Sequence, residues 1–204
     1  MAAQQLPVSR LHPKHQLISR DTSCLAVIDV QQYFLAKLPL DQRGPLVERI
    51  AWLMRVARAL DIPIVATAED IERDGPLVPQ LAAELQPGVT TLDKKVFGLW
   101  QQADTRAAVE RTGRSEIVLV GLETDVCIAH SALGLAEAGL RVVVIEDATA
   151  SPPPHHEAGL RRLHDAGITV TTVKGLFYEW VRDLATCHRI RAAVSGPLPP
   201  GLTL

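Results

Sequence analysis

The stretch VGLETDVCIAHSALGLAEAGLRVVVIEDATAS, residues 120–151, contains the pattern from which the architecture follows. It begins inside an apolar run, EIVLVG (116–121), and contains a second one, RVVVIEDA (141–148). Short, continuous apolar runs of this kind are typical of strands that are buried on both faces of a sheet. Residues 124–140 between them predict a helix. A strand, a helix and a strand in this order predict two parallel strands joined by a crossover helix.

The same alternation continues on both sides of this unit. Further strand-like runs are CLAVIDV (24–30), IPIVATA (62–68), the less regular VTTLDKKVF (89–97) and ITVTTV (168–173). Helices are predicted over 45–60, 99–113, 151–167 and 176–194, and residues 69–81 are predicted to form a loop. Six strands alternating with helices predict an α/β fold, a three-layer α/β/α sandwich around a six-stranded, mostly parallel, Rossmann-like sheet.

Composition predicts one ordinary globular domain. The chain has 204 residues, of which 47% are hydrophobic and 22% charged, enough for a full core. No linker or composition break divides it, so we expect a single domain over 1–204. Its polar leader spans 1–20, and its irregular, Pro-rich tail spans 195–204 and is suited to contact a partner subunit.

Charge and cysteine content exclude several classes of protein. A formal net charge of −2 predicts no nucleic acid and no membrane surface as partner. No run reaches the roughly 18 apolar residues that span a bilayer, and the leader lacks a secretory apolar stretch. Three scattered cysteines predict neither a disulfide framework nor a Cys-rich zinc site. We therefore expect a cytoplasmic protein.

The functional site is expected where the strands end, because an open parallel sheet binds ligands at the carboxyl ends of its strands. A carboxylate, one or two ammonium groups and a thiol can converge there. The chemistry-bearing residues after the predicted strands are Asp29, Glu69, Asp70, Asp93, Lys94, Lys95, Cys127, Glu146 and Asp147.

Cys127 is the most informative of these residues. Thr124 is a candidate N-cap, which would place Cys127 in the first turn of a helix. Free backbone N–H groups and the helix dipole there favour a thiolate and can bind a negative oxygen. Cys24 and Cys187 lie in a predicted strand and a predicted helix, where packing is the expected role.

Alternatives remain for the other candidates. Asp29 also suits a turn or helix cap, and Lys94 with Lys95 also suits a solvated charge pair. His130 lies three residues after Cys127, so a Cys–His dyad on one helix face is a further option. His155 and His156 follow three prolines and are interpreted as local structure, and the carboxylates of 69–81 as a solvated loop.

Four blocks of the chain, in order, resemble the isochorismatase-like hydrolases. They are CLAVIDVQQYF (24–34), LDKKVFGLW (92–100), the 120–151 stretch and AGITVTTVKGLFYEW (166–180). The resemblance implies a catalytic triad of Asp29, Lys94 and Cys127. The KxxF spacing selects Lys94 as the triad lysine, and Lys95 is the alternative. Gly98 replaces the Ser that usually follows the aromatic residue.

The resemblance also implies a cis peptide bond between Leu122 and Glu123. The bond would turn the backbone N–H of Glu123, together with that of Cys127, toward the oxyanion. In relatives the position of Glu123 often carries a bulkier apolar residue, so its role here stays open. Candidate pocket residues are Gln31, Phe34, Phe97 and Trp100.

The chemistry implied is nucleophilic hydrolysis. Asp29 takes the thiol proton, Lys94 keeps Asp29 ionised, and Cys127 forms a thioester-like intermediate that water then cleaves. We expect cleavage of an amide- or carbamoyl-type C–N bond in a small molecule. The alternatives are an isochorismatase-type ether hydrolase, a catalytically silent oligomeric scaffold and a thiol-redox protein.

No cofactor and no metal are expected, and a homo-oligomer is. Nicotinamidases, which resemble this fold, bind a metal with an Asp and nearby His residues after the second strand. The corresponding stretch here, 65–81, contains no His.

Overall fold

A six-stranded sheet forms the centre of the molecule in this computed structural model, which describes residues 16–194 and 196–204. The strand order is β3-β2-β1-β4-β5-β6, and every neighbouring pair is parallel. This confirms the predicted α/β class and sheet. The strands are β1 Ser23–Ile28, β2 Ile64–Glu69, β3 Thr91–Lys94, β4 Glu116–Leu122, β5 Arg141–Ala150 and β6 Thr169–Thr171.

The two central strands, β1 and β4, are buried along their whole length, as their continuous apolar sequences predict. Their ends approach closely where Ile28 pairs with Gly121. A Cβ atom on Gly121 would lie 2.0 Å from the carbonyl oxygen of Ile28, and the φ of Gly121 is +122°. Only glycine fits this position. The close approach brings together the chain segments that follow the two strands.

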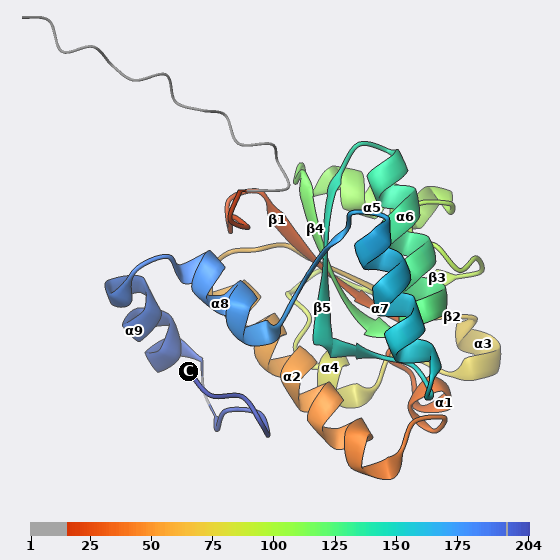
Figure 1. Ribbon diagram of the computed structural model, residues 1–204, viewed down its shortest axis with the longest axis horizontal. Helices are drawn as coiled ribbons and strands as arrows, with labels where there is room; N and C mark the ends of the chain where they lie inside the picture. The colour runs from red at the N-terminus through yellow and green to blue at the C-terminus, as the bar shows by residue number, and fades with distance from the viewer. Residues whose placement is uncertain (1–15, 195) are drawn as a thin grey trace, which may run out of the picture.

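Helices cover both faces of the sheet (Figure 1). On one face α2 (Leu40–Ala59), α8 (Val173–Val181) and α9 (Leu184–Ala193) share a buried apolar cluster with the strands. On the other face α5 (Ala103–Arg111), α6 (Ala129–Glu137) and α7 (His155–Asp165) share a second cluster. The predicted three-layer arrangement is therefore correct.

Three predicted elements differ from the structure. Residues 69–81 contain two short helices, α3 (Ile71–Asp74) and α4 (Pro79–Ala82), and a further short helix, α1 (Gln32–Leu35), follows β1. The helix predicted over 124–140 begins with a π-helical turn, η2 (Thr124–Ile128). The predicted last helix is divided into α8 and α9.

The division between α8 and α9 has a local cause. Arg182 adopts a positive φ of 66°, which ends α8. Asp183 then caps α9, because its side chain accepts a hydrogen bond from the backbone N–H of Thr186 at 2.7 Å.

The two chain ends pack against the domain where the structure describes them. Leu202 in the tail is buried, and Arg49 donates a hydrogen bond to the carbonyl oxygen of Pro200 at 3.2 Å. The tail thus folds back on its own chain. Of the predicted leader, residues 1–15 lie outside the described part, and Ile18 is fully buried. None of the helices in 16–194 and 196–204 has the length and apolarity needed to cross a membrane.

Candidate active site

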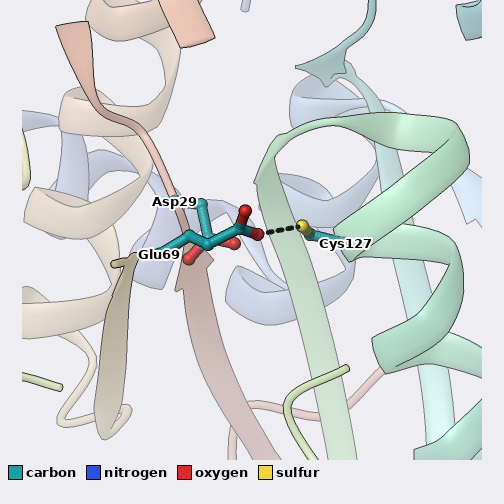
Figure 2. A group of neighbouring side chains, drawn as sticks. All are labelled: Asp29, Glu69 and Cys127. Atoms are coloured by element: carbon teal, nitrogen blue, oxygen red, sulfur yellow. Dashed lines mark hydrogen bonds between the residues drawn. The ribbon is translucent and has the colours of Figure 1, made fainter. Parts of the chain in front are cut away.

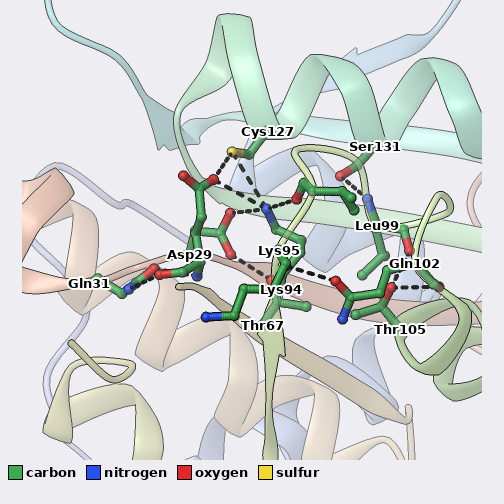
Figure 3. A network of polar contacts seen from close by, with 12 residues as sticks. Asp29, Gln31, Thr67, Lys94, Lys95, Leu99, Gln102, Thr105, Cys127 and Ser131 are labelled. Carbon is green, nitrogen blue, oxygen red and sulfur yellow. Dashed lines mark hydrogen bonds and ion pairs between the residues drawn. The ribbon is translucent and has the colours of Figure 1, made fainter. Parts of the chain in front are cut away.

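Asp29 lies directly after β1 and is fully buried. Its backbone has a φ of 52°, in the left-handed region that aspartate tolerates better than most residues. Thr67 on β2 donates a hydrogen bond to Oδ1 at 2.8 Å, and the ammonium of Lys94 lies 2.9 Å from Oδ2. Each carboxylate oxygen therefore has a polar partner within the protein (Figure 3).

Lys94 and Lys95 point in opposite directions, as successive residues around a strand end do. Lys94 is fully buried, and its Nζ donates a hydrogen bond to the carbonyl oxygen of Val96 at 2.6 Å. The same Nζ lies 3.8 Å from the sulfur of Cys127. Lys95 is half-exposed and pairs instead with Asp70 and Asp93. Of the two lysines left open by the sequence, Lys94 is the one beside the thiol.

Cys127 lies in the η2 turn after β4 and is buried. Its thiol donates a hydrogen bond to Oε2 of Glu69 at 3.1 Å (Figure 2). One carboxylate oxygen of Asp29, one of Glu69 and the sulfur all lie within 4.8 Å of one another. Three strand ends and one turn thus place two carboxylates and one ammonium around a single thiol.

Glu69 was predicted to belong to a solvated loop, and that interpretation is wrong. Its Cα pairs with that of Lys94 across β2 and β3, so the two side chains reach the same end of the sheet. The amide of Gln31 holds the Glu69 backbone, because it accepts from the Glu69 N–H and donates to the Glu69 carbonyl oxygen, both at 2.7 Å. The signal in the sequence was the position of Glu69 at the end of a predicted strand.

Burial dominates the electrostatics of the cluster. It raises the pKa of the Cys127 thiol, and the charges of Asp29 and Glu69 raise it further, against the opposing effect of Lys94. Burial also raises the pKa of Asp29, more than Lys94 and the hydrogen bonds lower it. For Lys94 burial acts to lower the pKa, but the surrounding negative charges outweigh it and the pKa is raised.

The thiolate expected from the helix dipole is therefore not the resting form of Cys127. Two carboxylates and a dry environment both disfavour a negative sulfur, and together they outweigh the dipole of one turn.

The turn that carries Cys127 is held by side chains from neighbouring elements. Thr124 does not cap the helix: its hydroxyl hydrogen-bonds Nδ1 of His156 at 2.8 Å. Ser151 donates to the Asp125 carboxylate at 2.6 Å. A Cβ atom on Gly159 of α7 would lie 2.9 Å from the Asp125 backbone, so α7 packs directly on the turn. His156, interpreted from sequence as local structure, contributes to this support.

The backbone before the turn contains a cis peptide bond between Leu122 and Glu123. The Glu123 carboxylate pairs with Lys37 at 3.3 Å. The ammonium of Lys37 also lies 4.4 Å from the ring centroid of Phe34, within the range of a cation–π contact. Lys37 thus links the segment after β1 to the segment before Cys127.

The remaining candidates have different surroundings. Phe97 is 53% exposed and its ring makes an edge contact with His130 at a centroid distance of 5.7 Å. His130 is exposed, and the hydrogen-bond acceptor of the Cys127 thiol is Glu69. Trp100 is partly buried against the core on the side of α5, α6 and α7.

The cluster has the residue types of a small metal site, since Asp29, Glu69 and Cys127 offer three ligand atoms within 4.8 Å. Lys94 lies among them, 2.9 Å from Asp29 and 3.4 Å from Glu69. An ammonium group at this position supplies the positive charge that the carboxylates require. The expectation of a metal-free site remains a prediction.

A parallel sheet with a thiol, an ammonium and carboxylates at its carboxyl edge is the arrangement of a cysteine hydrolase. Residues 23–175 match the model of the Isochorismatase domain. The chain belongs to this family of isochorismatase-like hydrolases, as the four sequence blocks predicted.

Relatives of known sequence and structure agree with this assignment. Isochorismatase domain-containing protein 2A of Mus musculus is 30% identical over 203 residues, which cover 98% of this chain and 92% of the relative. YcaC of Escherichia coli, described as an octameric hydrolase of unknown specificity, has a TM-score of 0.76 at 24% identity and covers 87% of this chain and 90% of its own. The MAR1 ribonuclease of Caenorhabditis elegans has a TM-score of 0.79 at 24% identity, covering 93% and 98%. These two likenesses concern the fold.

Proposed function

We propose that this protein hydrolyses an amide- or carbamoyl-type C–N bond of a small molecule, with Cys127 as the nucleophile. The observation that carries the proposal is the set of contacts around the sulfur. A carboxylate accepts the thiol hydrogen bond at 3.1 Å, and an ammonium lies 3.8 Å away. A nucleophile, a proton acceptor and a fixed positive charge are the groups that covalent acyl transfer requires.

The reaction follows from these positions. A carboxylate of the cluster takes the thiol proton while the sulfur attacks the carbonyl carbon, and Lys94 stabilises the negative charge that develops. The backbone N–H groups of Glu123 and Cys127 are the proposed donors to the oxyanion. The amine then leaves with a proton, and water cleaves the resulting thioester.

The position of the thiol favours this reading over ether hydrolysis. Cleavage of a vinyl ether needs a proton donor but no covalent nucleophile. In this chain the cluster is assembled around the sulfur, with Lys94 and Glu69 both in contact with it. Such an arrangement serves covalent catalysis better than simple proton donation.

The test is a substrate panel with wild type and Cys127→Ala. It contains small primary amides, carbamoyl amines, ureas, a vinyl ether and an RNA oligonucleotide, the last because one fold relative is described as a ribonuclease. Turnover of an amide or carbamoyl compound that Cys127→Ala abolishes supports the proposal. Turnover that survives the substitution, or that occurs only with the vinyl ether or RNA, contradicts it.

We also propose that the chain forms a homo-oligomer. Leu40 and Leu184 are 80% and 76% exposed, and Tyr33 in α1 is 44% exposed. YcaC of Escherichia coli, which shares this fold, is described as octameric. Contact with another subunit would remove these exposed side chains from water. Light scattering after size-exclusion chromatography tests this proposal, and a monomer at micromolar concentration contradicts it.

A further inference from the structure

Glu123 lies between the end of β4 and the η2 turn, and its backbone is held on both sides. The backbone N–H groups of Val126 and Ile128 donate to the Glu123 carbonyl oxygen at 3.2 and 3.1 Å. On the other side, Leu122 is fully buried and pairs with Ala150 of β5. A contact that also fixes the Glu123 side chain therefore defines the direction of the N–H between these anchors.

Lys37, which follows α1, provides that contact. Its ammonium lies 3.3 Å from the Glu123 carboxylate, and the two side chains are 37% and 15% exposed. An ion pair this open stabilises little by itself. The ammonium has a second anchor, because it lies 4.6 Å from the ring centroid of Tyr33 and 4.4 Å from that of Phe34. A cation within about 6 Å of a ring centroid is attracted to the face of the ring.

Phe34 connects this anchor to the interior of the domain. It is 6% exposed and belongs to the apolar cluster that α2, α8 and α9 share with the sheet. The backbone N–H of Lys37 also donates to the Phe34 carbonyl oxygen at 3.1 Å. A chain of contacts thus runs from the core, through one ammonium group, to Glu123, whose N–H is a proposed donor to the oxyanion.

We propose that Lys37 is a positioning residue for oxyanion stabilisation. It acts through the Glu123 carboxylate and keeps the Glu123 N–H directed at the reacting carbonyl oxygen. This inference rests on the proposed function. In this role Lys37 leaves the thiol itself unchanged, so it affects only reactions in which an oxyanion forms.

Two reactions of the same thiol distinguish this role from others. Hydrolysis of p-nitrophenyl acetate forms an oxyanion in both acylation and deacylation, whereas alkylation of Cys127 by iodoacetamide displaces iodide without one. Lys37→Met removes the charge and keeps an unbranched side chain. It lowers kcat for hydrolysis about ten- to a hundred-fold, because a misplaced donor loses much of its effect. KM stays nearly unchanged, since both steps slow together, and the alkylation rate at pH 7.5 stays at the wild-type value.

Three further variants complete the experiment. Lys37→Arg retains the charge and the attraction to the rings, so it restores most of the hydrolysis. Glu123→Gln lowers hydrolysis as Lys37→Met does, and the double variant is no slower, because both substitutions break one link. The matched control, Lys174→Met, removes an exposed ammonium group from α8 and leaves both rates unchanged. Thermal melting verifies the fold of every variant, and Glu123→Gln provides the same test if Lys37→Met does not fold.

Three outcomes overturn the role of Lys37. They are wild-type hydrolysis in Lys37→Met, a parallel fall of hydrolysis and alkylation as a merely structural role would give, and a loss that Lys37→Arg does not recover. Cys127→Ala separates this inference from the proposed function. If Cys127→Ala is inactive while Lys37→Met is fully active, only the role of Lys37 fails. If Cys127→Ala remains active, the proposed function fails.

Discussion

Two lysines that follow one another in the chain, Lys94 and Lys95, form two ion-pair groups with contrasting surroundings. Lys94 and its partner Asp29 are fully buried, whereas the side chain of Lys95 is 51% exposed and pairs with Asp70 and Asp93 on the surface. The residue types and distances are alike. The contrast shows that burial decides whether such a group can support chemistry, because water screens the outer pairs and cannot screen the inner one.

The largest effect is expected from breaking the inner pair. Lys94→Met leaves the carboxylate of Asp29 buried without its cation, and removal of one partner of a buried pair typically costs about 3–5 kcal/mol. Activity is lost as well, because no ammonium faces the sulfur. Urea unfolding and turnover assays measure the two effects. The control, Lys95→Met, leaves the stability to urea and the turnover rate unchanged. Equal effects of Lys94→Met and Lys95→Met would contradict the difference between the buried and the exposed ion pairs.

A second substitution sharpens the comparison. The double variant Lys94→Met/Asp29→Asn removes both charges of the inner pair together. It therefore unfolds at a higher urea concentration than Lys94→Met, which leaves the Asp29 charge unpaired. Coupled neighbours differ from additivity by about 0.5–3 kcal/mol. A double-mutant cycle in urea measures this coupling. Additive losses would show that Lys94 and Asp29 do not depend on each other.

The pH dependence separates the two groups further. Lys94 lowers the pKa of Asp29, so Lys94→Met raises that pKa above its already elevated value. A carboxyl with a raised folded-state pKa favours the folded state when protonated, and this contribution is lost as pH rises through that pKa. The stability deficit of Lys94→Met relative to wild type is therefore smaller near pH 5 than near pH 8. A deficit that is constant with pH in thermal melts would argue against a buried, unpaired Asp29.

The smallest effect is expected from removing metal ions. Lys94 already supplies a positive charge to both carboxylates, so hydrolysis does not require a cation. Dialysis against EDTA leaves the turnover rate unchanged, and added zinc does not increase it. Loss of activity in EDTA with recovery by zinc would contradict the metal-free site.

The sheet was predictable from sequence because most of its strands are short apolar runs between turn residues, although β3 is not. The approach of Asp29, Lys94 and Cys127 was predictable from the resemblance to a family with a known order of motifs. The KxxF spacing of the resemblance already favoured Lys94 over Lys95, and the structure places Lys94 beside the thiol and Lys95 on the surface.

Glu69 was among the strand-end candidates, but its contact with the thiol was missed for a related reason. Its role depends on the pairing of β2 with β3 and on Gln31, which is 38 residues away in the chain. The π-helical turn at Thr124–Ile128 has no composition signal, because it arises from the Ile128 N–H bond to the Glu123 carbonyl oxygen. The break before α9 had a signal, since Asp183 followed by Thr186 is a capping pattern.

The most direct test of covalent catalysis is mass spectrometry of wild-type protein quenched with acid during hydrolysis of p-nitrophenyl acetate. The predicted result is an acetyl group on the peptide that contains Cys127, formed at the rate of the nitrophenolate burst and absent from Cys127→Ala. Steady hydrolysis with no acetyl group on Cys127, and with equal turnover by Cys127→Ala, would contradict the mechanism.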